Sequence, residues 1–142
     1  MDFTFMDYDP AQHKEGVLEL FADLNYKRKI IDWQFSRTNT DGLTSVTPIV
    51  AISNGKVIGF NGVLPVEVYA NDTTGSAVWS CDFFVSTAFR GKGVGTALKK
   101  FMYQRFPRVL TSGISDKAYN ILMAQGCKSL ATVQHQRAVN QQ

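Results

Sequence analysis

The sequence predicts an α/β fold in which a mixed β-sheet carries α-helices on its faces. Two observations point to this fold class. The 142 residues are 44% hydrophobic and 19% charged, which is the balance of a globular chain of one domain's size. The hydrophobic pattern also changes along the chain, from helical spacing near the N-terminus to strand-like runs in the middle and back to helical spacing. We therefore expect a single domain over residues 1–142.

Three elements are expected before residue 36. Alternation in residues 3–5 predicts a short first strand. Asp9 is a suitable helix N-cap and Pro10 suits the first helical position, and apolar residues then recur at helical spacing as far as Leu24. A second short helix is expected over 27–35.

The middle of the chain is rich in strand signals. Asn54-Gly55 lies between two apolar runs, and this pair is the strongest two-residue signal for a hairpin turn. The run 77–86 is apolar on both faces, as in a strand that is covered on both sides. The elements expected here are a loop at 36–45, strands at 48–52 and 57–69 with an irregularity near Gly62 or Pro65, a turn at 71–76 and the strand at 77–86.

After residue 94 the hydrophobic period becomes helical again. Apolar residues between Val94 and Met102 fall on one helical face, and Pro107 marks the end of this helix. The remaining expected elements are a strand at 108–111, a helix at 116–125 closed by Gly126, and a weaker strand at 129–139. The predicted order is β-α-α-β-β-β-α-β-α-β.

Charge and composition argue against several classes of function. The net charge of +3 favours a polyanionic small ligand but is too small and too scattered to indicate nucleic acid. Cys81 and Cys127 lack metal-ligand or redox spacing, so reduced thiols are expected. No apolar run approaches the roughly 20 residues of a membrane span, and residues 1–7 lack the basic start of a signal peptide. We expect a cytoplasmic protein with no metal, membrane or nucleic-acid partner.

A glycine-rich loop with two basic residues joins the strand 77–86 to the helix that follows. Its glycines let backbone N–H groups converge, and the helix directs its positive dipole end to the same point. Such a nest binds phosphate oxygens, and two flanking cations suit a diphosphate. The loop is not a P-loop, because Gly93 follows Lys92 where Ser or Thr is required, and its third glycine comes one residue too early for a dinucleotide fingerprint. The loop reads Arg90-Gly91-Lys92-Gly93-Val94-Gly95-Thr96.

The pattern V-x-x-x-x-R-G-x-G-x-G-T, from Val85 to Thr96, resembles motif A of the GNAT acetyltransferase superfamily. The segment 81–85, Cys-Asp-Phe-Phe-Val, is similar to the motif-A strand of polyamine acetyltransferases, and a looser resemblance runs from Phe3 to about Gly126. The resemblance implies a GNAT-like mixed, mostly antiparallel sheet with helices on both faces, short at the C-terminus. It also implies that acetyl-CoA is the co-substrate. By resemblance, Phe83, Phe84 and Val85 bind its pantetheine arm, and Arg90, Gly91, Lys92, Gly93, Val94, Gly95 and Thr96 bind its pyrophosphate.

The same resemblance implies transfer of an acyl group to a small amine-type acceptor by direct attack on the thioester. Backbone N–H groups of the motif-A strand can hold the oxyanion. Asp82 is the nearest carboxylate, and it either accepts the proton of the amine or orients a cationic acceptor without taking a proton. Cys81 stands where the polyamine enzymes carry a second acid, which is a departure from polyamine specificity.

Two further departures concern the general acid and the C-terminus. Leu122 occupies the position of the usual catalytic tyrosine of the family, and Tyr119, about one turn earlier, is either a substitute acid or a tyrosine at the edge of the core. Ser115 is either a pantetheine ligand or the N-cap of the following helix. Sixteen residues follow Gly126, enough for one strand where the family usually has two. Two expectations are open: a homodimer that completes the exposed sheet edge, or a chain that is the first part of something longer.

Several other residues carry open alternatives. Lys99 and Lys100 either contact an adenosine 3′-phosphate or lie on a solvated helix face, and Trp33 and Phe35 either close over the acceptor or pack in the core. His13 and His135 are expected at the surface. Two functions remain open, an N-acyltransferase and a non-catalytic acyl-CoA-binding module, and a peptide or protein N-acetyltransferase differs from the first only in its acceptor groove.

Overall fold

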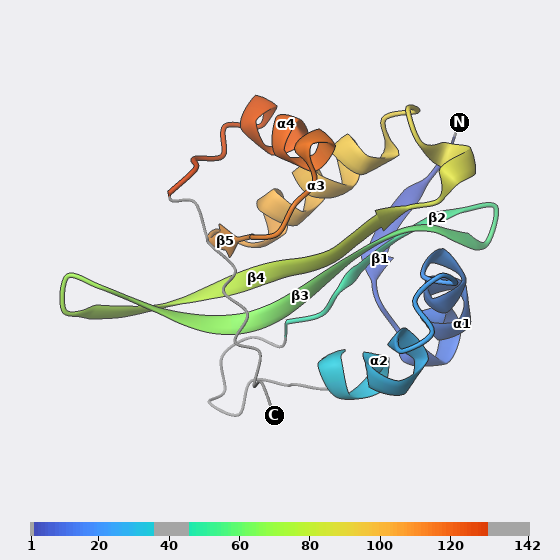
Figure 1. Ribbon diagram of the computed structural model, residues 1–142, viewed down its shortest axis with the longest axis horizontal. Coiled ribbons are helices and arrows are strands. Elements are labelled where there is room, and N and C mark those ends of the chain that lie inside the picture. The colour runs from blue at the N-terminus through green and yellow to red at the C-terminus, as the bar shows by residue number, and fades with distance from the viewer. Residues whose placement is uncertain (1, 36–45, 131–142) are drawn as a thin grey trace, which may run out of the picture. The chain divides into compact units, whose positions relative to one another are not determined.

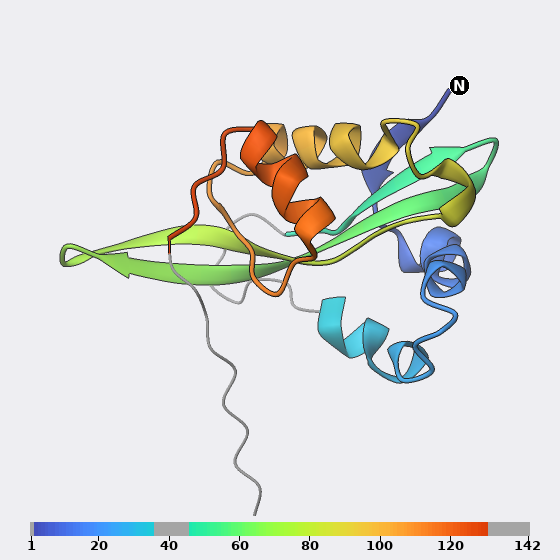
Figure 2. The same cartoon turned by 45° about the horizontal axis from the view of Figure 1, so that its top comes forward.

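The computed structural model describes residues 2–35 and 46–130. The chain forms two compact units, residues 1–111 and 112–142. The elements of the first unit, seen in Figures 1 and 2, are β1 (Thr4–Asp7), α1 (Pro10–Leu20), α2 (Lys27–Phe35), β2 (Ile49–Ser53), β3 (Lys56–Ala70), β4 (Thr73–Val85), the 3₁₀ turn η1 (Thr87–Phe89), α3 (Val94–Arg105) and β5 (Val109–Leu110). The second unit contains α4 (Asp116–Ala124).

The sheet of the first unit has the strand order β1-β2-β3-β4-β5. Neighbouring strands from β1 to β4 are antiparallel, and only β5 is parallel to its neighbour β4. Helices α1 and α2 cover one face of the sheet and α3 covers the other (Figures 1 and 2). The predicted fold class, a mixed and mostly antiparallel sheet with helices on both faces, is therefore confirmed.

The first helix begins as the sequence predicts and ends earlier. The Asp9 carboxylate accepts a hydrogen bond from the Ala11 amide at 2.9 Å, and Pro10 occupies the first helical position. The helix ends at Leu20, and its C-cap residue Phe21 is buried. His13 is buried and its Nδ1 accepts a hydrogen bond from the Asp9 amide at 2.9 Å, so the expected surface position of this histidine is wrong.

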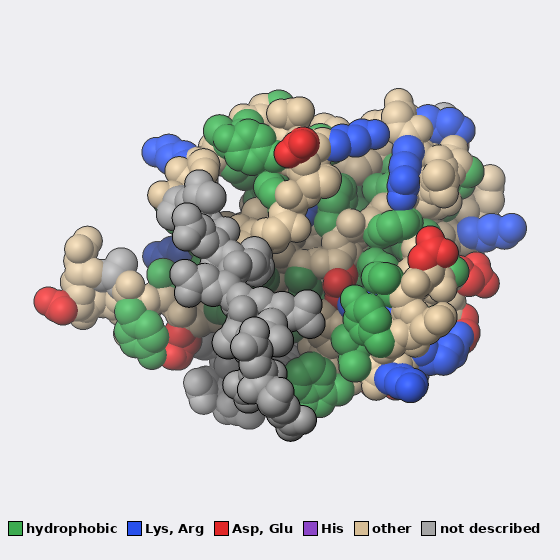
Figure 3. Space-filling view, viewed as in Figure 1, with side chains coloured by type: hydrophobic (Ala, Val, Ile, Leu, Met, Phe, Trp, Pro, Cys, Tyr) green, Lys and Arg blue, Asp and Glu red, His purple; other side chains and the backbone are tan. Residues whose placement is uncertain are grey.

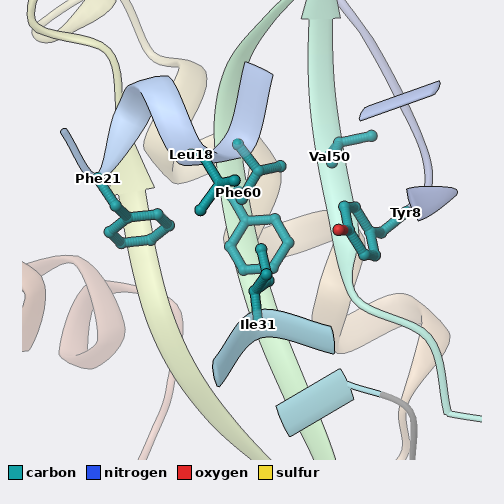
Figure 4. Close-up of a cluster of buried hydrophobic side chains, with 7 residues drawn as sticks. Tyr8, Leu18, Phe21, Ile31, Val50 and Phe60 are labelled. Atoms are coloured by element: carbon teal, nitrogen blue, oxygen red, sulfur yellow. The ribbon is translucent and has the colours of Figure 1, made fainter. Parts of the chain in front are cut away.

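The core lies on both faces of the sheet. Phe60 of β3 is fully buried under α1 and α2, where its ring meets Phe21 at 6.0 Å and Phe35 at 5.5 Å between centroids. On the opposite face Leu98 and Met102 of α3 are also fully buried. These contacts fix the three helices on the sheet. The side chains labelled in Figure 4, all from the α1 and α2 face, are Tyr8, Leu18, Phe21, Ile31, Val50 and Phe60.

Strands β3 and β4 extend past the rest of the sheet as a hairpin arm, residues 66–77. The two strands stay paired from Gly59 opposite Val85 to Ala70 opposite Thr73, so the turn is only Asn71-Asp72 and not the predicted 71–76. Both turn residues have positive φ, which Asn and Asp tolerate. The arm is at the left of Figure 1, and Figure 3 shows acidic side chains on it, which are Glu67 and Asp72.

The second unit contains the predicted last helix. The Ser115 hydroxyl caps α4 by accepting a hydrogen bond from the Ala118 amide at 3.3 Å, and Gly126 closes it with φ of 85°. Ser129 and Leu130 are not in a strand, and the rest of the predicted strand at 129–139 lies outside the described residues, as do the predicted loop 36–45 and His135. None of the helices described here is long and apolar enough to cross a membrane.

Candidate active site

The predicted glycine-rich loop is a turn that leads directly from η1 into α3. Gly91 and Gly93 have φ of 75° and 82°, in the left-handed region, and a Cβ at either position would meet no atom within 4 Å. These two glycines are thus required by backbone conformation. Gly95 serves packing, since a Cβ there would lie 3.3 Å from the Phe83 ring of β4. Gly93 is the N-cap of α3 and makes no side-chain cap, and the N-terminus of a helix attracts an anion.

The two basic side chains of the loop lie against aromatic rings. The Lys92 ammonium lies 5.5 Å from the Phe89 ring centroid. The Arg90 side chain folds back onto the end of β4, where its Nε donates a hydrogen bond to the Val85 carbonyl at 3.0 Å and its guanidinium carbon lies 4.9 Å from the Phe84 ring centroid. Arg90 therefore contacts the strand that precedes the loop.

Strand β4 has an open edge next to this loop. Its pairing with β5 involves only Val78 and Trp79, and the Thr111 hydroxyl adds a contact to the Ser80 carbonyl at 3.4 Å. Within the described part of the chain, the segment 81–85 has no strand on that side. The exposed peptide groups of this segment can bind an extended ligand in the manner of an added strand.

A β-bulge interrupts β4 within the same segment. Phe84 pairs with Phe60 and Cys81 pairs with Gly62, so two residues, Asp82 and Phe83, oppose the single residue Asn61. Asp82 takes φ of 49°, in the left-handed region. The expected irregularity near Gly62 is confirmed, and it reverses the alternation of side chains in β4.

The Asp82 carboxylate is held by two residues of α2. Its Oδ2 accepts a hydrogen bond from the Lys27 ammonium at 2.7 Å and another from the Gln34 amide at 2.9 Å. The Lys27 ammonium also donates to the Gln34 side-chain oxygen at 3.2 Å, which closes a triangle. The Lys27 side chain is 3% exposed and that of Asp82 is 21% exposed, so the ion pair is largely shielded from water.

Neither Lys27 nor Gln34 is predicted as a site residue. They are seven positions apart, two turns of α2, and so share one helix face. They lie 55 and 48 residues before Asp82, so no local pattern connects them to it. The Lys27 ammonium also lies 5.4 Å from the ring centroid of Phe21, a residue close to it in the sequence.

Cys81 lies beside this triangle as a protonated thiol. The Gln34 amide nitrogen lies 3.9 Å from its sulfur. Burial, and then the neighbouring Asp82 charge, raise the pKa of Cys81 to about 12. The residue in the position of the second acid of polyamine acetyltransferases is therefore neutral, and a single carboxylate serves this side of the bulge.

Lys99 is buried on the other face of the sheet. Only 2% of the residue is exposed, and its ammonium donates hydrogen bonds to the Asn61 side-chain oxygen at 2.7 Å and to the Ser80 hydroxyl at 2.9 Å. It also lies 4.3 Å from the Phe83 ring centroid. Both expectations for Lys99, a nucleotide contact and a solvated helix face, are wrong, whereas Lys100 is exposed. The reason is that polar groups of β3 and β4 face α3 at this point.

The remaining predicted site residues belong to the second unit or to α2. Ser115 and Tyr119 belong to the second unit; Ser115 is the N-cap of α4 and Tyr119 is 43% exposed. Trp33 is exposed at 64%, and Phe35 packs in the core against Phe60. The structure thus brings together the glycine loop, the open edge of β4 and Asp82 within one unit.

The comparisons with known proteins agree with this arrangement. Residues 13–117 match the model of the acetyltransferase (GNAT) family. No curated protein sequence matches the chain. Similar solved structures include glucosamine-6-phosphate N-acetyltransferase from Arabidopsis thaliana, with 16% identity over 99% of this chain and 100% of that chain and a TM-score of 0.67. A GNAT family acetyltransferase of Staphylococcus aureus has 14% identity over 97% and 100%, and a TM-score of 0.71.

A third similar structure is an acetyltransferase of Trypanosoma brucei, with 14% identity over 96% of this chain and 100% of that chain and a TM-score of 0.70. These identities are low, so the structural likeness concerns the fold. The family model covers most of the chain and includes the loop, the bulge and the helix α2. The chain therefore belongs to the acetyltransferase (GNAT) family.

Proposed function

We propose that this protein is an N-acetyltransferase that transfers the acetyl group of acetyl-CoA to a small amine. The observation that carries this proposal is the uncapped glycine turn at the start of α3, which directly follows a bulged strand with an open edge. Membership of the acetyltransferase family supports the same reaction. We propose further that the two units form one domain and that the protein acts in the cytoplasm.

The geometry of the loop and strand supports the proposed cofactor positions. The diphosphate of acetyl-CoA binds the loop from Arg90 to Thr96, where the positive end of α3 and the Arg90 and Lys92 side chains attract it. The pantetheine arm lies along Phe83, Phe84 and Val85, whose β5-side edge is open among the described residues. The thioester is then next to the bulge, where a backbone N–H of β4 can stabilise the oxyanion.

Asp82 orients the acceptor at the bulge. Both of its hydrogen bonds from described residues reach Oδ2, and we propose that Oδ1 accepts a hydrogen bond from the incoming amine. The amine nitrogen attacks the thioester carbon, the C–N bond forms, the C–S bond breaks and the CoA thiolate leaves. The amine proton passes to Asp82 or to water through it. Tyr119 is proposed as the acid that protonates the thiolate, and Ser115 as a pantetheine ligand.

A second candidate function is a non-catalytic acyl-CoA-binding module. The observation that favours it is Leu122, which stands where the family usually has its catalytic tyrosine. Loss of a general acid typically lowers a rate roughly 10²–10⁴-fold. Turnover with any amine excludes this module, and binding of acetyl-CoA without turnover supports it.

The first experiment measures the thermal stability of the protein with acetyl-CoA and then the release of free thiol with a panel of amines and peptides. Saturating acetyl-CoA should raise the melting temperature by linkage. Gly93→Ala should abolish most of this shift, because the substitution strains the turn that presents the amides. Gly55→Ala is the matched control, since Gly55 has φ of 72° and equally open space in the β2–β3 turn.

The control variant should lose a similar amount of stability and keep the response to acetyl-CoA. An absent shift in the wild-type protein would refute the whole proposal. If both glycine variants keep the rise in melting temperature with acetyl-CoA, the diphosphate binds elsewhere. Thiol release with peptides but with none of the small amines would identify a peptide N-acetyltransferase instead.

A further inference from the structure

A buried polar cluster lies beside the bulge in β4, between the sheet and α3. Its members are Asn61 of β3, Ser80 of β4 and Lys99 of α3, which are 0%, 3% and 2% exposed. The Lys99 ammonium donates to the Asn61 side-chain oxygen at 2.7 Å and to the Ser80 hydroxyl at 2.9 Å. The Asn61 amide also donates to the Ser80 hydroxyl at 3.0 Å. We call these three residues the Lys99 cluster.

The Lys99 cluster joins three elements at the bulge. Asn61 is the single residue of β3 that lies opposite the two bulge residues, Asp82 and Phe83. Ser80 lies two positions before Asp82 in the same strand. One ammonium therefore ties both strands of the bulged pair to α3, the helix whose first turn belongs to the glycine loop.

Phe83, the second residue of the bulge, contacts the same helix. Its ring centroid lies 4.3 Å from the Lys99 ammonium. A Cβ at Gly95 would lie 3.3 Å from the ring, so the ring packs closely against the backbone of α3. Gly95 and Lys99 are four positions apart and thus share one face of the helix. The bulge is therefore in contact with two successive turns of α3.

The two residues of the bulge are held from opposite faces of the sheet. Asp82 bonds to Lys27 of α2 and Phe83 contacts Lys99 of α3, and both lysines are buried. The φ of Asp82 is 49°, a left-handed conformation that a residue other than glycine keeps only where its surroundings hold it. Burying an ammonium costs free energy that an apolar side chain at position 99 would not cost. A buried lysine at this place therefore favours a role in positioning.

We propose that Lys99 is a positioning residue for acetyl transfer, which acts through the Lys99 cluster to hold the bulge in place relative to the start of α3. This inference rests on the proposed acetyltransferase function, in which the diphosphate of acetyl-CoA binds at that start and the thioester lies next to the bulge. Because the cofactor spans both places, the thioester meets Asp82 only if the bulge stays in position. A displacement of about 1 Å can lower a rate roughly 100-fold.

The experiment removes the ammonium with Lys99→Met and uses the amine that the wild-type protein acetylates fastest. We expect kcat to fall about tenfold or more. The KM for acetyl-CoA should change less than about twofold, because the glycine turn that binds the diphosphate is intact. Val50→Ala is the matched control, since Val50 is fully buried in β2, a strand that does not pair with β4. It should lower the melting temperature and keep kcat.

The triple variant Lys99→Met/Asn61→Leu/Ser80→Ala separates positioning from stability. None of its three side chains leaves a buried polar atom, so its melting temperature should recover part of the loss in Lys99→Met. Its kcat should stay low, because the bonds that tie the two strands to α3 are absent. A kcat that recovers with the melting temperature would overturn the inference. So would a kcat in Lys99→Met equal to that of Val50→Ala, or a raised KM for acetyl-CoA with an unchanged kcat.

If no amine is acetylated, the proposed function fails by itself, and amide hydrogen exchange then tests the inference without turnover. Exchange within residues 81–85 should be faster in Lys99→Met and in the triple variant than in the wild-type protein. In the triple variant, exchange in the paired strands β1 and β2 should match the wild-type rate. Wild-type exchange at residues 81–85 in both variants refutes the inference.

Discussion

Removing either charge of the ion pair between Lys27 and Asp82 should lower the free energy of unfolding, and the two losses should be unequal. Breaking a buried pair by removing one partner costs about 3–5 kcal/mol, because the other charge stays buried without compensation. Asp82→Asn leaves the ammonium in this state, and the Lys27 side chain is only 3% exposed, so the full range applies. Lys27→Met leaves a carboxylate that is 21% exposed and still bonded to Gln34, so we expect about 1–3 kcal/mol.

The double variant Lys27→Met/Asp82→Asn contains neither charge and should be more stable than the sum of the single losses predicts, with a coupling of about 2–3 kcal/mol. Urea denaturation at neutral pH measures all three free energies of unfolding. Arg28→Gln is the control, because its pair with Glu15 is exposed and should shift the midpoint little. A larger loss in Lys27→Met than in Asp82→Asn, or additive losses, would refute the reasoning.

Other consequences of the structure can be measured on the same protein. Phe60→Ala should lower the free energy of unfolding by about 3–5 kcal/mol, since the ring is fully buried; a loss below that of Phe60→Leu would contradict the packing. Lys99→Met should cost about 1–3 kcal/mol in urea denaturation because its two polar partners lose a donor, and an unchanged midpoint would count against it. Burial raises the pKa of Cys81 from 9.0 and that of Tyr8 from 10.0, each to about 12. Above pH 9 the unfolded chain therefore loses protons that the folded chain keeps, so melting temperatures should fall between pH 9 and 12, less steeply in Cys81→Ser.

Local signals predict much of the fold. The bounds of α2 agree with the prediction over 27–35, and the cap at Asp9 agrees with its short-range pattern. The turn at 71–76 is wrong because Thr, Gly and Ser residues that favour turns are held in β4 by pairing with β3. Periodicity thus divides the chain into its elements, whereas the length of the arm is set by pairing between β3 and β4, which the turn-favouring residues at 73–76 do not signal.

The candidate site is predictable only in part, because some of its contacts join residues that are far apart in the sequence. The glycine loop is a local motif, and its left-handed glycines lie where the pattern placed them. Asp82 could be named from the resemblance, but its ammonium partner Lys27 comes from a different element. A lysine at the start of a helix carries no signal that it is buried, and the same applies to Lys99, whose neighbours on the helix face are apolar.

The bulge in β4 makes the strand intolerant of changes in length. Because Asp82 is the extra residue, Cys81 and Phe84 face α1 and α2 while Ser80 and Phe83 face α3. Deleting one residue here would restore strict alternation and exchange the layers that every later side chain of the strand occupies. Divergence of this protein should therefore leave the spacing between the bulge and the loop intact, while insertions at the tip of the arm, which change no inward-facing position, remain permissible.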